Sequence, residues 1–349
     1  MLRVNFLDLF VQHWQNTLAD KVVAAIQEVR ALAWAKGDVT SDGMLFIAAI
    51  VDGGRGKRSY GHNYSSNSGV GCVIGERTGK LLYLGVRNKC CYRCSVSAPD
   101  ADPVDHVCTK NFTGPSTGME QTIIVEGLTH VYREHGLWVK FVIGDGDPSV
   151  YARVRERAPR GSLVLKLECS NHMTRNYTSK LHAVRQNTKF PLAARKVLTD
   201  TIPRLSAAVR GAIRNNAEEG GGVEQLRADL RNGPRHVFGD HSGCRAAHCT
   251  RKESDESNHV PSMQLCGLMQ EVENLVDFVV RRADRLTLNT TTNLVENFMS
   301  LVAKMVESKR VDFAKGGSYG RQCLAAARCR EHTVAPLGLQ SEAQNDGTL

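Results

Sequence analysis

Hydrophobic residues near the N-terminus recur at intervals of three and four. Val22, Ile26 and Val29 follow this spacing, which places them on one face of an α-helix. The pattern predicts a helix over residues 1–36, within an N-terminal helical segment that extends to residue 43.

The next hydrophobic positions form short continuous stretches that are typical of strands. Residues 44–51 are all apolar and are followed by Asp52, as expected for a buried strand with an acidic residue at its exit. Ser68–Gly75 and residues 80–88 should follow as an antiparallel pair, because a Thr-Gly turn lies between them. The three segments together predict an antiparallel meander.

Farther along the chain, helical and strand patterns alternate. The spacing predicts a helix over residues 116–134, a strand over 138–143, a short helix over 149–157 and a strand over 162–167. The resulting order is β-β-β-α-β-α-β, with acidic residues at the exits of the first and fourth strands. This order is typical of an RNase H-like fold.

The sequence therefore predicts an α/β protein with a mixed five-stranded sheet flanked by helices and interrupted by two insertions. A core of residues 44–172 would contain a Cys/His-rich loop at 89–114. A long helical insertion at 173–290, with a second Cys/His loop, would precede the final core helix within 291–330. The polar tail at 331–349 is expected to be disordered.

Three acidic residues occupy positions suited to metal-dependent chemistry. Asp52 and Asp145 follow neighbouring strands, and Glu296 lies in the first turn of the final helix. Carboxylate oxygens are the ligands that Mg²⁺ prefers, and two such ions can assist phosphodiester cleavage. Each acid also has a purely structural interpretation. The two Asp-Gly sequences could be turns, with Asp147 as the reserve for Asp145, and Glu296 could cap its own helix.

Eleven cysteines are present, and several lie close to histidines. Cys91 and Cys94 have the x₂ spacing common in zinc sites. After eleven intervening residues come His106 and Cys108, which are one residue apart. Four such ligands would hold one structural zinc ion. The alternative is a mobile loop with reduced thiols.

A second, looser set of ligands is His241, Cys244 and Cys249. These residues could bind zinc together with Cys169 and His172, or bind no metal. Alternatively, Cys169 is a buried thiol and His172 a residue hydrogen-bonded to the backbone. A supporting role near the expected acidic site is also consistent with their place after the fifth strand.

The charge balance is basic, with 45 Lys and Arg against 36 Asp and Glu, which suits a polyanionic partner. Lys57, Arg58, Arg175 and Lys180 are candidate contacts to DNA phosphates, although such side chains are often merely solvated. The sequence contains no stretch of 18 apolar residues and begins without the pattern of a secretory signal.

Four segments of the chain resemble the Mutator-like transposases: residues 51–61, 142–147, 167–172 and 292–298. The resemblance implies a DDE-type catalytic triad, carried here by Asp52, Asp145 and Glu296, with the helical insertion before the glutamate. It also matches the family's Cys-x-x-His element with Cys169 and His172.

This resemblance implies a transposase that uses Mg²⁺ or Mn²⁺ to hydrolyse and join double-stranded DNA, acting on transposon ends and a target. We expect a homodimer or larger assembly, structural zinc, and a nuclear location. Arg55 stands where the family usually has tryptophan. One alternative is therefore a catalytically inactive, domesticated DNA-binding protein, and another is a stand-alone RNase H-like nuclease.

Overall fold

The computed structural model describes residues 6–56, 66–96, 106, 108–144, 148–249, 257–306 and 318–333. Among these residues, no helix is both long enough and apolar enough to cross a membrane.

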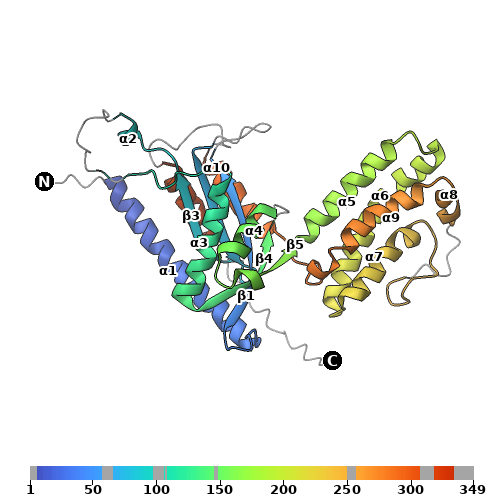
Figure 1. Ribbon diagram of the computed structural model, residues 1–349, viewed down its shortest axis with the longest axis horizontal. Coiled ribbons are helices and arrows are strands. Elements are labelled where there is room, and N and C mark those ends of the chain that lie inside the picture. Colours follow the sequence, from blue (N-terminus) through green and yellow to red (C-terminus); the bar gives the residue numbers. More distant parts are fainter. Residues whose placement is uncertain are drawn as a thin grey trace, which may run out of the picture. The chain divides into compact units, whose positions relative to one another are not determined.

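The fold contains a five-stranded mixed sheet flanked by helices (Figure 1). Its strand order is β3-β2-β1-β4-β5, and β2 pairs antiparallel with both β1 and β3. The strands are β1 (Leu45–Arg55), β2 (Ser68–Gly75), β3 (Leu81–Asn88), β4 (Leu137–Gly144) and β5 (Leu165–Glu168). The predicted mixed sheet flanked by helices is confirmed.

Strand β1 is longer than the apolar pattern predicted. It was expected to end before Asp52, but it continues to Arg55 because Gly53 and Gly54 stay extended rather than turning. Both glycines pair with β2, opposite Gly71 and Val70. Asp52 therefore lies within a paired strand and not at its exit.

Helices cover both faces of β1. Helix α3 (Gly118–His135) packs so closely on β2 and β3 that Ile123 Cγ2 lies 2.8 Å from the place a Cβ would take on Gly71, and 2.5 Å from the corresponding place on Gly85. A larger residue would not fit at either position. Successive residues of a strand point to opposite faces, and a Cβ added at Gly53 would meet α3 whereas one added at Gly54 would meet α10 (Asn293–Met305). Helix α10 therefore lies on the other face of β1.

The chain divides into two compact units. The first falls within Met1–Val142, Asp147–Leu165 and Asn293–Leu349, and the second within Ile143–Gly146 and Lys166–Thr292. Besides α3 and α10, the described helices of the first unit are α1 (Phe6–Ala35), α2 (Tyr92–Val96), α4 (Pro148–Arg157) and α11 (Ser318–Thr333). Its core joins α1 residues such as Ile26 to strand and α3 residues.

The second unit is mainly helical and has a hydrophobic core of its own. Its helices are α5 (Ser170–Gln186), α6 (Leu192–Glu218), α7 (Val223–Val237), α8 (Val260–Leu265) and α9 (Leu268–Val280). Tyr177, Leu198, Phe238 and Val272 are among the buried side chains that join these helices. The helical character predicted for this part of the chain is present.

Three further details differ from the sequence predictions. Helix α2 forms inside the Cys/His-rich loop predicted for residues 89–114, and α11 is a second helix in a C-terminal segment for which only one helix was predicted. The strand predicted to begin at residue 162 begins at Leu165, after a 3₁₀ turn. The amides of Gly161, Leu163 and Val164 bond back to the preceding turn, which keeps that segment out of the sheet.

Candidate functional site

Asp52 is held in the middle of the sheet on strand β1. It is half-buried, and its Oδ1 accepts a hydrogen bond of 2.8 Å from the backbone N–H of Gly53. In the ladder it lies opposite Cys72 on β2. Burial, and then the nearby Asp52 charge, raise the pKa of the Cys72 thiol well above its usual value. The position of Asp52 is thus fixed by strand pairing rather than by a flexible loop.

Glu296 lies on the helix that covers the Asp52 face of β1. It belongs to the first turn of α10 and is half-buried. One turn later, Met299 Sδ is 3.5 Å from the place a Cβ would take on Gly54. Residues three apart share a helix face, and residues two apart share a strand face. Asp52 and Glu296 are therefore carried by facing surfaces of β1 and α10.

The second predicted acid, Asp145, and its reserve, Asp147, lie outside the described residues. The strand before them is described: β4 is the neighbour of β1 in the sheet and ends at Gly144. Gly144, the last described residue of β4, therefore lies on the strand next to β1 and directly precedes Asp145 in the sequence.

A fourth acid beside Asp52 was missed by the sequence analysis. Glu120, in the first turn of α3, lies so close to Gly53 that its Cδ is 2.7 Å from the place a Cβ would take there. Its charge also contributes to the raised pKa of Cys72. The sequence showed only a glutamate in a first helical turn, which usually stabilises the helix end. Glu120 and Met299 lie on opposite faces of β1.

Cys169 and His172 form a small hydrogen-bonded cluster with Thr292. The Thr292 hydroxyl lies 3.2 Å from Cys169 Sγ and 3.3 Å from His172 Nδ1, and its backbone N–H donates to Cys169 Sγ at 3.4 Å. Cys169 is buried. Thr292 directly precedes Asn293, the first residue of α10.

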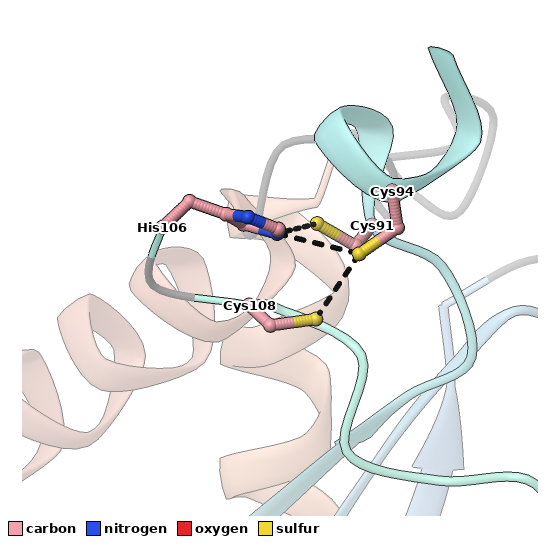
Figure 2. Close-up of side chains that lie close together, drawn as sticks. All are labelled: Cys91, Cys94, His106 and Cys108. Carbon is pink, nitrogen blue, oxygen red and sulfur yellow. Dashed lines mark hydrogen bonds between the residues drawn. The ribbon is translucent and has the colours of Figure 1, made fainter. Parts of the chain in front are cut away.

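The first predicted zinc set comes together as expected. Cys91, Cys94, His106 and Cys108 offer ligand atoms within 4.8 Å of one another, and Figure 2 shows them converging from α2 and the flanking loop. His106 Nε2 is 3.3 Å from the sulfurs of Cys91 and Cys94, and the Cys94 and Cys108 sulfurs are 3.5 Å apart. Tetrahedral zinc spaces such atoms about 3.3–3.8 Å apart. The donor set fits zinc.

Local hydrogen bonds prepare one thiol of this set for metal binding. The backbone N–H groups of Cys94 and Thr109 lower the pKa of Cys91 to about 5. A thiol with this pKa is ionised at neutral pH, and the thiolate is the form that binds zinc. Hydrogen bonds with Cys108 and Cys91 raise the pKa of Cys94 to about 11.

The second Cys/His set differs from the predicted one. His236, His241, Cys244 and Cys249 come together, with all ligand atoms within 4.8 Å. The two Nδ1 atoms are 3.1 Å apart, and His236 Nδ1 lies 3.3 Å from Cys244 Sγ and 3.8 Å from Cys249 Sγ. These spacings also fit tetrahedral zinc.

Of the alternatives for Cys169 and His172, membership of this second set is not found: Cys169 is a buried thiol, and both residues contact Thr292 instead. His236 was missed because it lies at the end of α7, where a histidine usually just complements the helix dipole. A spacing of His-x₄-His-x₂-Cys-x₄-Cys was the available signal.

A known protein family matches most of the chain. The model of the Mutator-like transposase family matches residues 8–249. The chain belongs to the Mutator-like transposases. No curated protein and no solved structure gives a match. The matched segment includes Asp52, Asp145 and both Cys/His sets, and it ends before Glu296.

Membership in the Mutator-like transposases implies an enzyme class that acts on nucleic acid, with DNA as the partner. Of the four predicted phosphate contacts in this family member, Lys57 and Arg58 lie outside the described residues. Arg175 is exposed on α5. The Lys180 side chain lies over the Phe278 ring, with its Nζ 3.8 Å from the ring centre.

Proposed function

We propose that this chain is the catalytic domain of a DNA transposase that uses Asp52, Asp145 and Glu296 as a DDE triad. The observation that carries the proposal is the packing of α10 on β1, with Asp52 and Glu296 on the facing surfaces. More than 200 residues separate the two acids in the sequence. This packing carries both acids to the same side of β1, as a shared metal site requires.

The order of elements also supports an RNase H-like fold. Three antiparallel-paired strands come first, β4 lies on the other side of β1, and β5 completes the sheet. The acids that we assign to catalysis lie on β1, directly after β4, and on the late helix α10. The helical unit of residues 166–292 is inserted between the second and third of these acids.

Two magnesium ions are the cofactors that this donor set suits. Mg²⁺ binds hard oxygen ligands and retains several waters, and Asp52 and Glu296 offer half-buried carboxylates on rigid elements. When bound, two such ions activate the attacking oxygen and stabilise the leaving oxygen of a phosphodiester. The protein holds Asp52 in place by pairing β1 with β2.

Both Cys/His sets are proposed to hold structural zinc. Each has four soft ligands, which fill a tetrahedral zinc and leave no position for water or substrate. The first ion would stabilise the loop between β3 and α3. The second would attach the loop of residues 241–249 to the end of α7.

The proposed reaction is hydrolysis at the 3′ ends of the transposon and their transfer to target DNA. Because two ends must be processed together, we propose that the protein acts as a homodimer or larger assembly. We also propose a nuclear location, as expected for an enzyme that acts on chromosomal double-stranded DNA. Arg55, three residues beyond Asp52 at the end of β1, favours the second candidate, an inactive domesticated DNA-binding protein.

The deciding experiment measures cleavage and joining of a labelled duplex carrying the transposon ends, with Mg²⁺ and the full chain. Asp52→Asn should abolish both reactions and leave DNA binding intact, because it removes a negative charge that holds Mg²⁺ while sparing phosphate contacts. The Arg55→Trp variant is assayed in parallel. If both the natural chain and Arg55→Trp bind DNA but neither cleaves nor joins it, the domesticated alternative replaces the proposed catalytic function.

A further inference from the structure

The helical unit has a polar groove between α5 and α6, which lie side by side (Figure 1). Its volume is about 460 Å³. Hydroxyl groups of Thr174, Thr178, Ser179 and Ser206 line it, together with the basic side chains of Arg175, His182 and Arg210. No carboxylate is among the described residues that line the groove. Its chemistry is therefore that of an anion-binding surface.

On α5, polar residues recur at the spacing of one helix face, where hydrophobic residues are more usual. Positions 171, 174, 175, 178, 179 and 182 all face the groove, which is the i, i+3, i+4, i+7 spacing of one helix face. At 1.5 Å per residue, this face extends for about 16 Å. It is long enough to contact several phosphates in succession, since one DNA strand has a phosphate about every 3.4 Å along the axis.

The hydroxyl groups of the groove are ordered by their own hydrogen bonds. Thr178 Oγ1 donates to the Thr174 carbonyl at 2.8 Å and lies 2.9 Å from Ser206 Oγ. Arg210 Nη2 donates to Ser206 Oγ at 3.2 Å. Arginine has five N–H donors, so this single bond positions the guanidinium and leaves most of its donors available to a ligand.

Several arginines of the helical unit pair with acidic residues, but within the described part of the chain Arg175 and Arg210, both exposed, do not. By contrast, Arg214 pairs with Glu218, and Arg245 pairs with both Glu219 and Asp229. Two uncompensated guanidinium groups beside ordered hydroxyls suit phosphate oxygens, which arginine can bind through two parallel hydrogen bonds.

We propose that the α5–α6 groove binds the phosphate backbone of DNA, with Arg175 and Arg210 as the charged contacts and the Ser179 hydroxyl as a neutral donor. The inference rests on the proposed function for its choice of DNA. It adds a binding surface within the helical unit, and this surface contacts no bases. The groove should therefore strengthen binding to any sequence rather than select the transposon ends.

The test compares the salt dependence of DNA affinity for the full chain and for the double variant Arg175→Ala/Arg210→Ala, using a labelled duplex of random sequence. Each phosphate contact contributes about 0.9 to the log–log slope, so the slope should fall by about 2. Arg214 lies on α6, as Arg210 does, but is already ion-paired, so Arg214→Ala should leave the slope unchanged. Arg175→Lys/Arg210→Lys keeps both charges and should restore most of the slope.

Circular dichroism checks that each variant is folded, and inorganic phosphate serves as a competitor. Equal slopes for the double variant and Arg214→Ala would overturn the groove proposal and leave the catalytic proposal intact. If inorganic phosphate binds saturably and removes the difference in slope between the natural chain and the double variant, the groove holds a single phosphate. That result would also contradict the groove proposal. Conversely, a groove-dependent slope in a chain that never cleaves DNA would sustain the groove and refute catalysis.

Discussion

The two units of this protein carry their functional groups in different ways. In the sheet unit, Asp52 and Glu296 lie half-buried on elements whose approach is fixed by strand pairing and by close contact at glycines. In the helical unit, Arg175 and Arg210 are exposed on helix surfaces, beside ordered hydroxyls. Metal-assisted chemistry needs ligands at fixed positions, whereas phosphate binding needs mainly charge and donors. The difference predicts that catalysis and DNA binding can be lost separately.

The largest effect should come from a comparison of the two glutamates that flank β1. Glu296 is on the Asp52 face and Glu120 on the opposite face. Even ligand-supporting residues of metal sites contribute about 10–100-fold to activity or metal affinity. Glu296→Gln, which removes a ligand, should therefore reduce strand cleavage by more than about 100-fold, whereas Glu120→Gln should retain most of the activity.

Rates of cleavage of a labelled duplex in Mg²⁺ measure both variants. If Glu120→Gln were the inactive one and Glu296→Gln remained active, the acid on α3 rather than the acid on α10 would be the metal ligand. Equal DNA affinity of the two variants is the control for folding.

The next effect concerns the helical unit and its own Cys/His set. His236→Ala removes one of four zinc ligands, and structural zinc sites bind with about 10–16 kcal/mol in small peptides. We expect the zinc content to fall from two ions per chain to one and the thermal stability of the helical unit to fall with it. Elemental analysis and thermal unfolding measure these changes.

His248→Ala is the matched control, because His248 lies in the same loop but pairs with Glu219 instead of joining the ligand set. A chain that contains no zinc when purified without chelator would contradict both zinc assignments. Zinc loss in His248→Ala alone would contradict the assignment of His236 as the fourth ligand.

The smallest effect is expected at the connection between the helical insertion and α10. Thr292→Val removes the hydroxyl that contacts Cys169 and His172 but keeps the backbone bond to Cys169. A hydrogen bond of this kind contributes about 1 kcal/mol, so the free energy of unfolding should fall by that amount. Cleavage should slow as well, because the start of α10 is less firmly held.

Thr291→Val serves as the control, since the Thr291 hydroxyl has no hydrogen-bond partner among the described residues. Denaturant unfolding and cleavage rates are measured for both variants. The positioning role of Thr292 is wrong if Thr292→Val loses stability but cleaves as fast as Thr291→Val.

Local patterns in the sequence predicted much of the fold. The apolar stretches located all five strands, and the Cys91-x₂-Cys94 spacing located the first ligand set, because both signals lie within a few neighbouring residues. The continuation of β1 past Asp52 was not predictable in this way. It depends on pairing with Gly69 and Gly71 of β2, and two adjacent glycines by themselves are typical of a turn.

The parts of the candidate sites that the sequence did not predict depend on tertiary contacts. His236 joins the second ligand set only because the loop of residues 241–249 folds back onto the end of α7. Similarly, Glu120 comes beside Asp52 only through the close packing of α3 on Gly53. The α5–α6 groove also includes Ser206 and Arg210 of α6. These two residues lie about thirty positions beyond the α5 residues of the groove, so local sequence patterns could not link them.

The central claim is that Asp52, Asp145 and Glu296 bind the catalytic metal ions together. Its most direct test is a crystal structure of the full chain soaked in Mn²⁺, with the ions located by anomalous scattering. We predict two ions about 3.5–4 Å apart, bound by these three carboxylates. If the ions bind elsewhere, or if Glu296 turns back to cap α10 and contacts no metal, the proposed triad is wrong.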